Sequence, residues 1–238
     1  MNILNDIVDF LFPRYCPICG KRLSSGEKNI CVLCLNDLPR TNAHFTEDNP
    51  IEKLYWTHLP IERATSFFFY NSIESRETIY HTKYFNDPKV GEAVARVMAE
   101  ELKETDFFDG MDIIVPIPLH PRRLRKRGYN QCDFIAKGIS EETGLPIEKN
   151  AVRRIIDNSS QTQLTTTERK ENVVGIFQLI HPEKVLGKHV LLIDDVITTG
   201  ATSISCGQEL VKAGDVKISV ISMAYAGKSF LSYENRQY

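Results

Sequence analysis

An apolar run at residues 190–193, followed directly by two acids and a turn of small and hydroxyl-bearing residues, restricts the fold more than any other part of this sequence. Helical spacing begins soon afterwards, at residues 203–213. A buried strand, a polar turn and an amphipathic helix in this order are typical of an α/β fold with a mainly parallel sheet flanked by helices. Open sheets of this kind bind ligands at the carboxyl ends of their strands, so we expect Asp194 and Asp195 to face a ligand.

The turn that follows the acid pair has the composition of a phosphate-binding loop. Its backbone N–H groups can converge on one anion, because Gly200 permits a close approach and the dipole of the next helix favours negative charge. The carboxylates of Asp194 and Asp195 can accept hydrogen bonds from two neighbouring ribose hydroxyls. The alternative is an ordinary loop and helix cap, and the turn lacks the lysine of a Walker-type nucleotide site. The predicted phosphate ligands are Thr198, Thr199, Gly200, Ala201 and Thr202.

Four cysteines near the amino terminus form two close pairs, Cys16 with Cys19 and Cys31 with Cys34. Each pair can present two thiolates from one tight turn, and together they supply the tetrahedral sulfur set that Zn²⁺ prefers. Because protein ligands then fill all four positions, the predicted zinc is structural. A redox pair, an iron–sulfur cluster and disulfides are the alternatives.

The remaining segments predict alternating strands and helices without an internal repeat. The predicted division is a helix and metal module at residues 1–40, a linker and a further region at 41–110, and an α/β core at 111–238. Strands are expected at residues 64–70, 112–116, 151–155, 190–193 and 217–223, and helices at 3–11, 73–84, 90–102, 133–143 and 203–213.

The charges of the chain are balanced, since 29 basic and 31 acidic residues give a formal net charge of −2. No overall basic field favours nucleic acid or an anionic membrane, so any such binding has to be local. Residues 122–127 contain five cations, which can contact phosphate groups or form a solvated basic turn. No apolar run approaches the ~20 residues of a membrane span and no signal for secretion is present, so we expect a cytoplasmic protein without a membrane partner.

Motifs in order along most of the chain resemble the ComF family, in which a four-cysteine zinc module precedes a type I phosphoribosyltransferase domain. The segment at 188–202 is similar to the phosphoribosyl pyrophosphate motif of those enzymes. The other matching motifs are Cys-Pro-Ile-Cys-Gly at 16–20, Cys31 and Cys34, Lys83-Tyr84, Val-Pro-Ile-Pro-Leu-His-Pro at 115–121, Arg-Gly-Tyr-Asn-Gln at 127–131, Gln161 with Leu164, Glu168-Arg169 with Asn172, and Phe177.

The resemblance implies a type I phosphoribosyltransferase fold with a site for phosphoribosyl pyrophosphate. In that site Asp194 and Asp195 would hold the ribose hydroxyls, and residues 198–202 would hold the 5-phosphate. A loop for the pyrophosphate leaving group would follow the strand at 112–116, where rigid prolines would preorganise it. The candidate residues for this loop and the adjoining basic run are Pro116, Ile117, Pro118, Leu119, Arg123 and Arg127.

A flexible loop over the reactive centre is a further feature that the resemblance implies. The polar segment at 158–169 suits such a loop, which closes and excludes water. Gln161 and Arg169 are its candidate catalytic residues, together with the acid pair. The structural alternative for Arg169 is an ion pair with Glu168 or another acid.

The functions that the resemblance implies range from an enzyme to a binding protein. An enzyme would bind phosphoribosyl pyrophosphate with Mg²⁺ and transfer phosphoribose to an acceptor, selected by a hood of residues 60–110 and the zinc module. A binding protein would hold that ligand, or the phosphoribose of single-stranded DNA, during natural competence, while the zinc module docks a helicase or DNA-processing protein. A sensor of nucleotide-like ligands is the third hypothesis, and all three need the same acid pair and turn.

Overall fold

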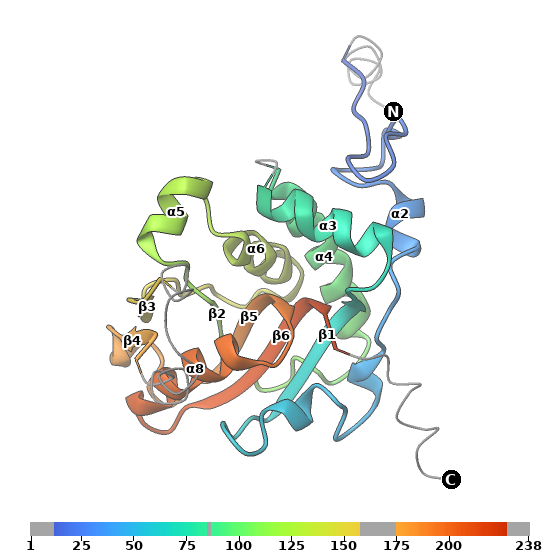
Figure 1. Cartoon of the computed structure of the whole chain (residues 1–238). Coiled ribbons are helices and arrows are strands. Elements are labelled where there is room, and N and C mark those ends of the chain that lie inside the picture. Colours follow the sequence, from blue (N-terminus) through green and yellow to red (C-terminus); the bar gives the residue numbers. More distant parts are fainter. Residues whose placement is uncertain (1–11, 85–86, 158–174, 228–238) are drawn as a thin grey trace.

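Four parallel strands form the central sheet in this computed structural model, which describes residues 12–84, 87–157 and 175–227. The strands lie in the order β1 (Arg63–Phe69), β6 (Lys217–Tyr225), β5 (His189–Ile197) and β2 (Ile113–Pro116) (Figure 1). The predicted α/β fold class with a parallel central sheet is therefore confirmed. The helix expected at residues 3–11 lies outside the described residues.

Two apolar cores lie on opposite faces of the sheet, and β5 contributes to both. Leu191 and Ile193 belong to the core that contains Met98 of the helical layer. Val190 and Leu192 belong to the other core. Successive strand residues point to opposite faces, so an uninterrupted apolar run is what a strand covered on both faces requires.

Helices cover both faces of this sheet (Figure 1). The core on one face includes residues of α3, α4 and α6, and the core on the other includes residues of α8 and the segment that carries η1 and η2. Within the described ranges, none of the helices has the length and apolar character that a membrane span requires. The bounds are α2 (Val32–Asn36), η1 (Ala43–Phe45), η2 (Glu52–Leu54), α3 (Ile73–Tyr84), α4 (Lys89–Lys103), α5 (Pro121–Arg127), α6 (Gln131–Thr143), η4 (Pro182–Lys184), α8 (Ala201–Leu210) and η5 (Val211–Ala213).

The strand expected at residues 151–155 forms, but it does not join the parallel sheet. It appears as β3 (Val152–Arg154), which pairs antiparallel with β4 (Phe177–Leu179) in a separate two-stranded sheet. An apolar pattern indicates an extended segment, whereas its pairing partner is decided by tertiary contacts. Strand β1, from the segment at 41–110, pairs with β6 of the segment at 111–238. The predicted domain limits stay a prediction.

Helices α4 and α6 approach each other closely at Gly138. A Cβ atom at this position would lie 2.4 Å from the carbonyl oxygen of Glu92 and 3.0 Å from the Cβ atom of Ala95. The first distance is far inside van der Waals contact, and the atom it meets belongs to the backbone. The absence of a side chain at residue 138 therefore sets how closely the two helices pack.

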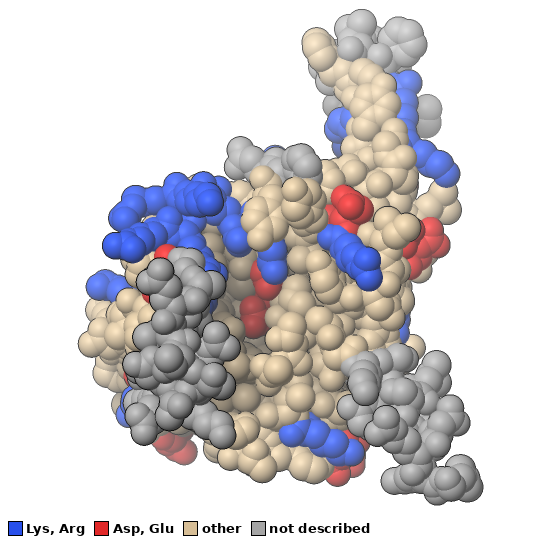
Figure 2. Space-filling model, viewed as in Figure 1, with Lys and Arg blue, Asp and Glu red and all other residues tan. Residues whose placement is uncertain are grey.

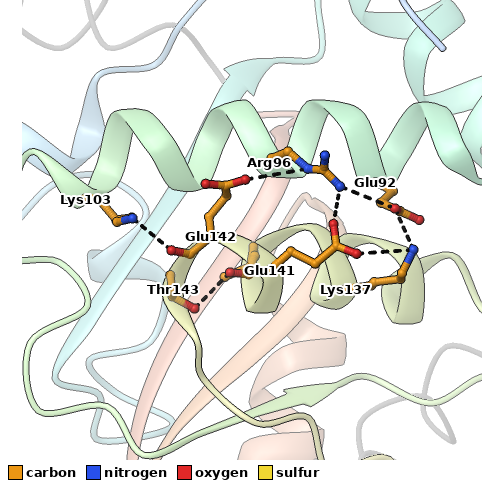
Figure 3. A network of polar contacts seen from close by, with 8 residues as sticks. Glu92, Arg96, Lys103, Lys137, Glu141, Glu142 and Thr143 are labelled. Atoms are coloured by element: carbon orange, nitrogen blue, oxygen red, sulfur yellow. Dashed lines mark hydrogen bonds and ion pairs between the residues drawn. The ribbon is translucent and has the colours of Figure 1, made fainter. Parts of the chain in front are cut away.

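An ion-pair network extends this contact between the two helices (Figure 3). Arg96 of α4 forms ion pairs with Glu141 and Glu142 of α6. Lys137 of α6 pairs with Glu92 of α4 at 2.7 Å. Surface ion pairs contribute little each, so we assign the stability of this interface mainly to its apolar and glycine packing.

Gly138→Ala is expected to lower the free energy of unfolding by about 2 kcal/mol. Alanine improves helix propensity by ~1 kcal/mol, but forcing α4 and α6 apart costs about 3 kcal/mol. Urea denaturation measures the difference. Gly26→Ala is the control, because a Cβ atom there meets nothing within 4 Å. Equal midpoints for Gly138→Ala and the unsubstituted protein would contradict the close packing.

Candidate functional site

The acid pair lines a cavity at the carboxyl end of β5. Asp194 and Asp195 are 9% and 5% exposed, yet both contribute to the wall of this cavity, whose volume is about 360 Å³. Figure 2 shows acidic atoms in a hollow beside a group of basic side chains on the face that carries α5. The two carboxylates therefore face a space large enough for a small ligand.

Two side chains from distant parts of the chain hold Asp195. Its carboxylate accepts a hydrogen bond from Gln131 Nε2 at 2.6 Å and forms an ion pair with Lys83 Nζ at 3.2 Å. Burial disfavours the charge on Lys83, but the Asp195 carboxylate outweighs this effect and raises the pKa of the lysine. The charge of Asp195 is thus balanced within the protein itself.

The carboxyl group of Asp194 is in a different electrostatic state. Its Oδ1 atom accepts a hydrogen bond from the backbone N–H of Asp195 at 2.9 Å. Burial, followed by the neighbouring charge of Asp195, raises the pKa of Asp194 to about 7. The group is therefore partly protonated near neutral pH, and a ligand that needs the carboxylate has to displace the proton.

Three arginines also line the cavity, namely Arg123, Arg127 and Arg154. Arg154 is 8% exposed, and its guanidinium carbon lies 5.4 Å from the centre of the Phe177 ring. Burial and then the charge of Arg123 lower the pKa of Arg154. Arg123 itself donates to Asp157 Oδ1 at 3.0 Å. The cavity thus has acids and cations side by side, as a ligand with hydroxyl and phosphate groups requires.

The loop after β2 forms another part of the wall. Ile117, Pro118 and Leu119 line the cavity, as expected for a loop that faces the ligand. Pro116 is the last residue of β2 and is buried in the sheet, where its position shapes the start of the loop. The roles of these four residues in binding pyrophosphate stay a prediction.

The basic run at residues 122–127 is a helix and not a solvated turn. Pro121 occupies the first turn of α5, and Arg122 N–H donates to His120 Nδ1 at 3.3 Å. Gly128 ends the helix with a φ angle of 85°. Arginine, lysine and leucine are good helix formers, and proline is favoured at the first helical position, so local sequence explains the helix.

The predicted phosphate turn connects β5 to α8. Residues 198–202 and Asp194 line a small cavity of about 40 Å³, and Thr198 and Thr199 are exposed. Gly200 is the N-cap residue of α8 and has a φ angle of 75°, a conformation that favours glycine. The turn is therefore accessible at the amino end of a helix, where backbone N–H groups lack helical partners.

Lys83, Gln131 and Arg154 were not predicted as site residues. The sequence pattern marks Lys83 and Gln131 only as parts of motifs, and their contacts with Asp195 depend on how α3 and α6 pack on the sheet. Arg154 has no such signal, because an arginine in a short strand normally points to solvent. The candidates Gln161 and Arg169 lie outside the described residues.

The four cysteines come together in a compact cluster. Their Sγ atoms all lie within 4.8 Å of one another, and those of Cys19 and Cys31 are 3.7 Å apart. Four ligands at 2.3 Å from a tetrahedral Zn²⁺ would place sulfur atoms about 3.8 Å apart. The spacing fits a metal ion, consistent with the predicted structural zinc, since no position is left open for a substrate.

Local structure orients the cysteine side chains. Gly20 follows the first pair with a φ angle of 69°, and the second pair flanks the start of α2. Backbone N–H groups point at sulfur atoms, from Cys31 to Cys16 Sγ at 3.5 Å and from Cys34 to Cys31 Sγ at 3.4 Å. Such N–H···S contacts stabilise thiolates, which are the form that binds metal.

The fold and the two sites define an α/β protein with a cavity at the carboxyl end of a parallel sheet and an appended cluster of four cysteines that are positioned to hold a metal ion. The curated proteins that it matches are named DNA utilization and competence proteins, in agreement with the resemblance to the ComF family. The chain is 28% identical over 208 residues to "DNA utilization protein YhgH" of Escherichia coli K12, spanning 86% of this chain and 87% of that protein. It is 29% identical over 216 residues to "Competence protein F" of Haemophilus influenzae, spanning 90% and 86%.

Further comparisons found matches at lower similarity. "Competence protein ComFC" of Bacillus subtilis is 25% identical over 190 residues, which span 79% of this chain and 74% of that protein. No model of a known protein family matches the chain. Among solved structures, the glutamine phosphoribosylpyrophosphate amidotransferase of B. subtilis aligns with a TM-score of 0.40 and 21% identity over 60% of this chain and 30% of that chain. Adenine phosphoribosyltransferase of Leishmania tarentolae aligns with a TM-score of 0.39 and 15% identity over 61% and 74%.

Proposed function

We propose that the protein binds phosphoribosyl pyrophosphate together with Mg²⁺ in the cavity and transfers the phosphoribosyl group to an acceptor. The observation that carries the proposal is that the acid pair and three arginines line one cavity, and that Asp194 and Thr202 of this cavity also line the small cavity of the phosphate turn. A ligand with two hydroxyls between two phosphate groups is complementary to this arrangement. The four-cysteine module at residues 1–40 and the segment at 60–110 would select the acceptor, and the 111–238 core would bind the ligand.

The residues around the cavity would bind different parts of the ligand. The amides of residues 198–202 hold the 5-phosphate, and Asp194 and Asp195 accept hydrogen bonds from the ribose hydroxyls. Lys83 holds the Asp195 carboxylate in place. Arg154 and its neighbours on α5 neutralise the pyrophosphate as the bond from C1 to its oxygen breaks and the acceptor forms a new bond to C1.

The oxygen ligands that Mg²⁺ prefers are present in the cavity. Asp194 fits such an ion, because burial and the charge of Asp195 raise its pKa, and a cation beside its carboxylate would offset both effects. The ion would be held by Asp194 and by oxygens of the ligand. When bound, it would supply further neutralisation of the pyrophosphate leaving group.

Binding of the magnesium complex of phosphoribosyl pyrophosphate is expected to strengthen as the pH rises from 6 to 8. Binding requires the ionised form of Asp194, whose pKa is about 7 in the free protein. Below that pH the affinity falls by up to about tenfold per pH unit, because the proton competes with the ligand. Titration calorimetry at the three pH values 6, 7 and 8, in buffers of different ionisation enthalpy, measures both the affinity and the proton released.

Magnesium pyrophosphate is the matched control ligand for this titration. It lacks the ribose hydroxyls that Asp194 is proposed to hold, so its affinity should change less with pH. Release of pyrophosphate from the full ligand, tested across a panel of nitrogenous acceptors, then reports turnover. A protein that binds neither ligand at pH 8 would refute the proposal.

A second candidate function is the binding of single-stranded DNA without turnover. The names of the relatives refer to DNA utilization and competence, and α5 presents Arg122, Arg125 and Lys126 to solvent beside the cavity. Tyr84, which lines the cavity, is 64% exposed and could stack on a base. Under this proposal the metal module docks a helicase or DNA-processing partner in the cytoplasm. Salt-sensitive binding of an oligonucleotide without pyrophosphate release would favour it over the enzyme.

A further inference from the structure

A buried tyrosine from the amino-terminal half of the chain contacts the phosphate turn. Tyr55 follows η2 and has 0% of its surface exposed. Its hydroxyl lies 2.8 Å from Ser203 Oγ, and Ser203 Oγ donates to the carbonyl oxygen of Gly200 at 3.0 Å. A serine hydroxyl has one proton, so Tyr55 is the donor to Ser203 in this arrangement. Two hydrogen bonds in series therefore link Tyr55 to the N-cap residue of α8.

These hydrogen bonds control the direction of an amide in the turn. In a trans peptide the carbonyl oxygen and the next N–H point in opposite directions. The Gly200 oxygen accepts hydrogen bonds from Ser203 Oγ and from the Ile204 N–H, the latter at 2.8 Å. Because this oxygen points into the helix, the N–H of Ala201 points out of the helix end. The Tyr55 ring also limits movement of the turn, since a Cβ atom on Gly200 would lie 3.5 Å from it.

The segment around Tyr55 is fixed at both of its ends. On the side of β1, Asn49 Nδ2 donates to the carbonyl oxygen of Ala64 at 3.0 Å. On the side of α8, Gln208 Nε2 donates to the carbonyl oxygen of His58 at 3.0 Å. We call residues 49–59 the strap, because they join the edge strand to the helix that begins at the phosphate turn.

Packing reinforces the contact between the strap and α8. Leu59 of the strap is 1% exposed and lies so close to Gly207 that a Cβ atom there would be 2.3 Å from Leu59 Cδ2. The strap therefore packs on the helix in one fixed arrangement. A strap residue that contacts the turn can thus hold the turn in place.

We propose that Tyr55 is a positioning residue that orients the amides of the phosphate turn through Ser203. The inference rests on the proposed function, since it concerns the part of that site which holds the 5-phosphate. Tyr55 lines neither the large cavity nor the small cavity of the turn, so it would act on a ligand only through the turn. Its effect is selective for the phosphate on the turn and does not extend to the pyrophosphate beside the arginines.

The test compares two ligands on the full-length protein. Tyr55→Phe keeps the ring and its packing and removes the hydroxyl. We expect it to weaken the binding of ribose 5-phosphate by about 3- to 10-fold and to leave the binding of magnesium pyrophosphate unchanged within twofold, by calorimetry at pH 8. Ser203→Ala should have an effect of similar size. The double variant should bind ribose 5-phosphate as tightly as the more affected single variant, because both substitutions break the same chain of hydrogen bonds.

Ser66→Ala is the matched control for the loss of a buried hydroxyl. Ser66 Oγ lies 2.6 Å from Ser222 Oγ inside the sheet, and neither serine lines either cavity, so this variant should lose stability without losing affinity. Equal weakening of both ligands, or an unchanged affinity of Tyr55→Phe for ribose 5-phosphate, overturns the role of Tyr55. If the unsubstituted protein itself binds no ribose 5-phosphate, the proposed function of the turn fails as well, so the two failures are distinguishable.

Discussion

Asp194→Asn is expected to bind no phosphoribosyl pyrophosphate at pH 8 and to be more stable than the unsubstituted protein. The amide keeps an oxygen that can accept the hydrogen bond from the backbone of Asp195. It removes the negative charge that the ribose hydroxyls and the metal ion are proposed to use. A residue kept for binding can thus be a cost to folding.

The sign of the stability change follows from the pKa of Asp194. The folded protein raises this pKa from 3.8 to about 7, so it binds the proton more tightly than the unfolded chain does. The protonated form of Asp194 therefore stabilises the folded protein at low pH, and this stability is lost as the pH rises from about 4 to 7. At pH 8 the ionised carboxylate destabilises the folded protein by the full amount. A shift of about three pKa units corresponds to a destabilisation of at most ~4 kcal/mol in the free energy of unfolding. Because the cavity admits water, we expect Asp194→Asn to raise the free energy of unfolding by about 2 kcal/mol.

Thermal unfolding and calorimetry measure the two effects on the same sample. For a chain of this size the gain corresponds to an increase of roughly 5 °C in the melting temperature at pH 8, and the difference should largely disappear at pH 4. Asp106→Asn is the control, because this exposed partner of Arg63 is far from the cavity. The variant Asp195→Asn should also lose the ligand, but without a gain in stability, since it leaves Lys83 without its carboxylate. Normal binding by Asp194→Asn would refute its assignment.

Removal of the metal from the four-cysteine cluster is expected to unfold the module and to destabilise the adjoining core. Cys16, Cys31 and Cys34 belong to the same apolar cluster as Phe67 and Met98, so loss of the module exposes part of the core. Structural zinc contributes its binding free energy to folding. A loss of ~5 kcal/mol would lower the melting temperature by about 10–20 °C.

Metal analysis and thermal unfolding after chelation test this second prediction. We expect one zinc ion per chain in the purified protein, and none in Cys34→Ser. Cys206→Ala is the matched control, since this buried cysteine lies in α8 and outside the cluster, and it should retain the zinc. A metal-free protein with an unchanged melting temperature would show that the four thiols do not need an ion.

Several elements could be predicted because their signals are local. The uninterrupted apolar run before Asp194 and Asp195 indicates a strand covered on both faces, and β5 has this position. The two Cys-x2-Cys pairs predict a cluster because each pair forms within one turn. The helical spacing at 90–102 corresponds to α4, which extends from Lys89 to Lys103.

Other features could not be predicted, because contacts between distant segments create them. The partner of Asp195 is Lys83, more than one hundred residues earlier, and no local pattern encodes that distance. Strand β3 was expected in the parallel sheet, yet it pairs with β4. Residues 40–60 lack a clear period, and the role of the strap within them follows only from the packing of Tyr55 and Leu59 against α8.

The sequence alone determined the chemistry that this protein can offer: two carboxylates and a hydroxyl-rich turn after a strand, four thiols in two pairs, and a basic run beside prolines. Those features are set by neighbouring residues, whose spacing the covalent chain holds nearly constant. Only the tertiary structure decided which groups share one cavity, how the surroundings of Asp194 and Asp195 differ, and which buried side chains fix the turn. The reason is that charge balance, burial and hydrogen bonding depend on through-space distances, and folding alone brings those distances into range.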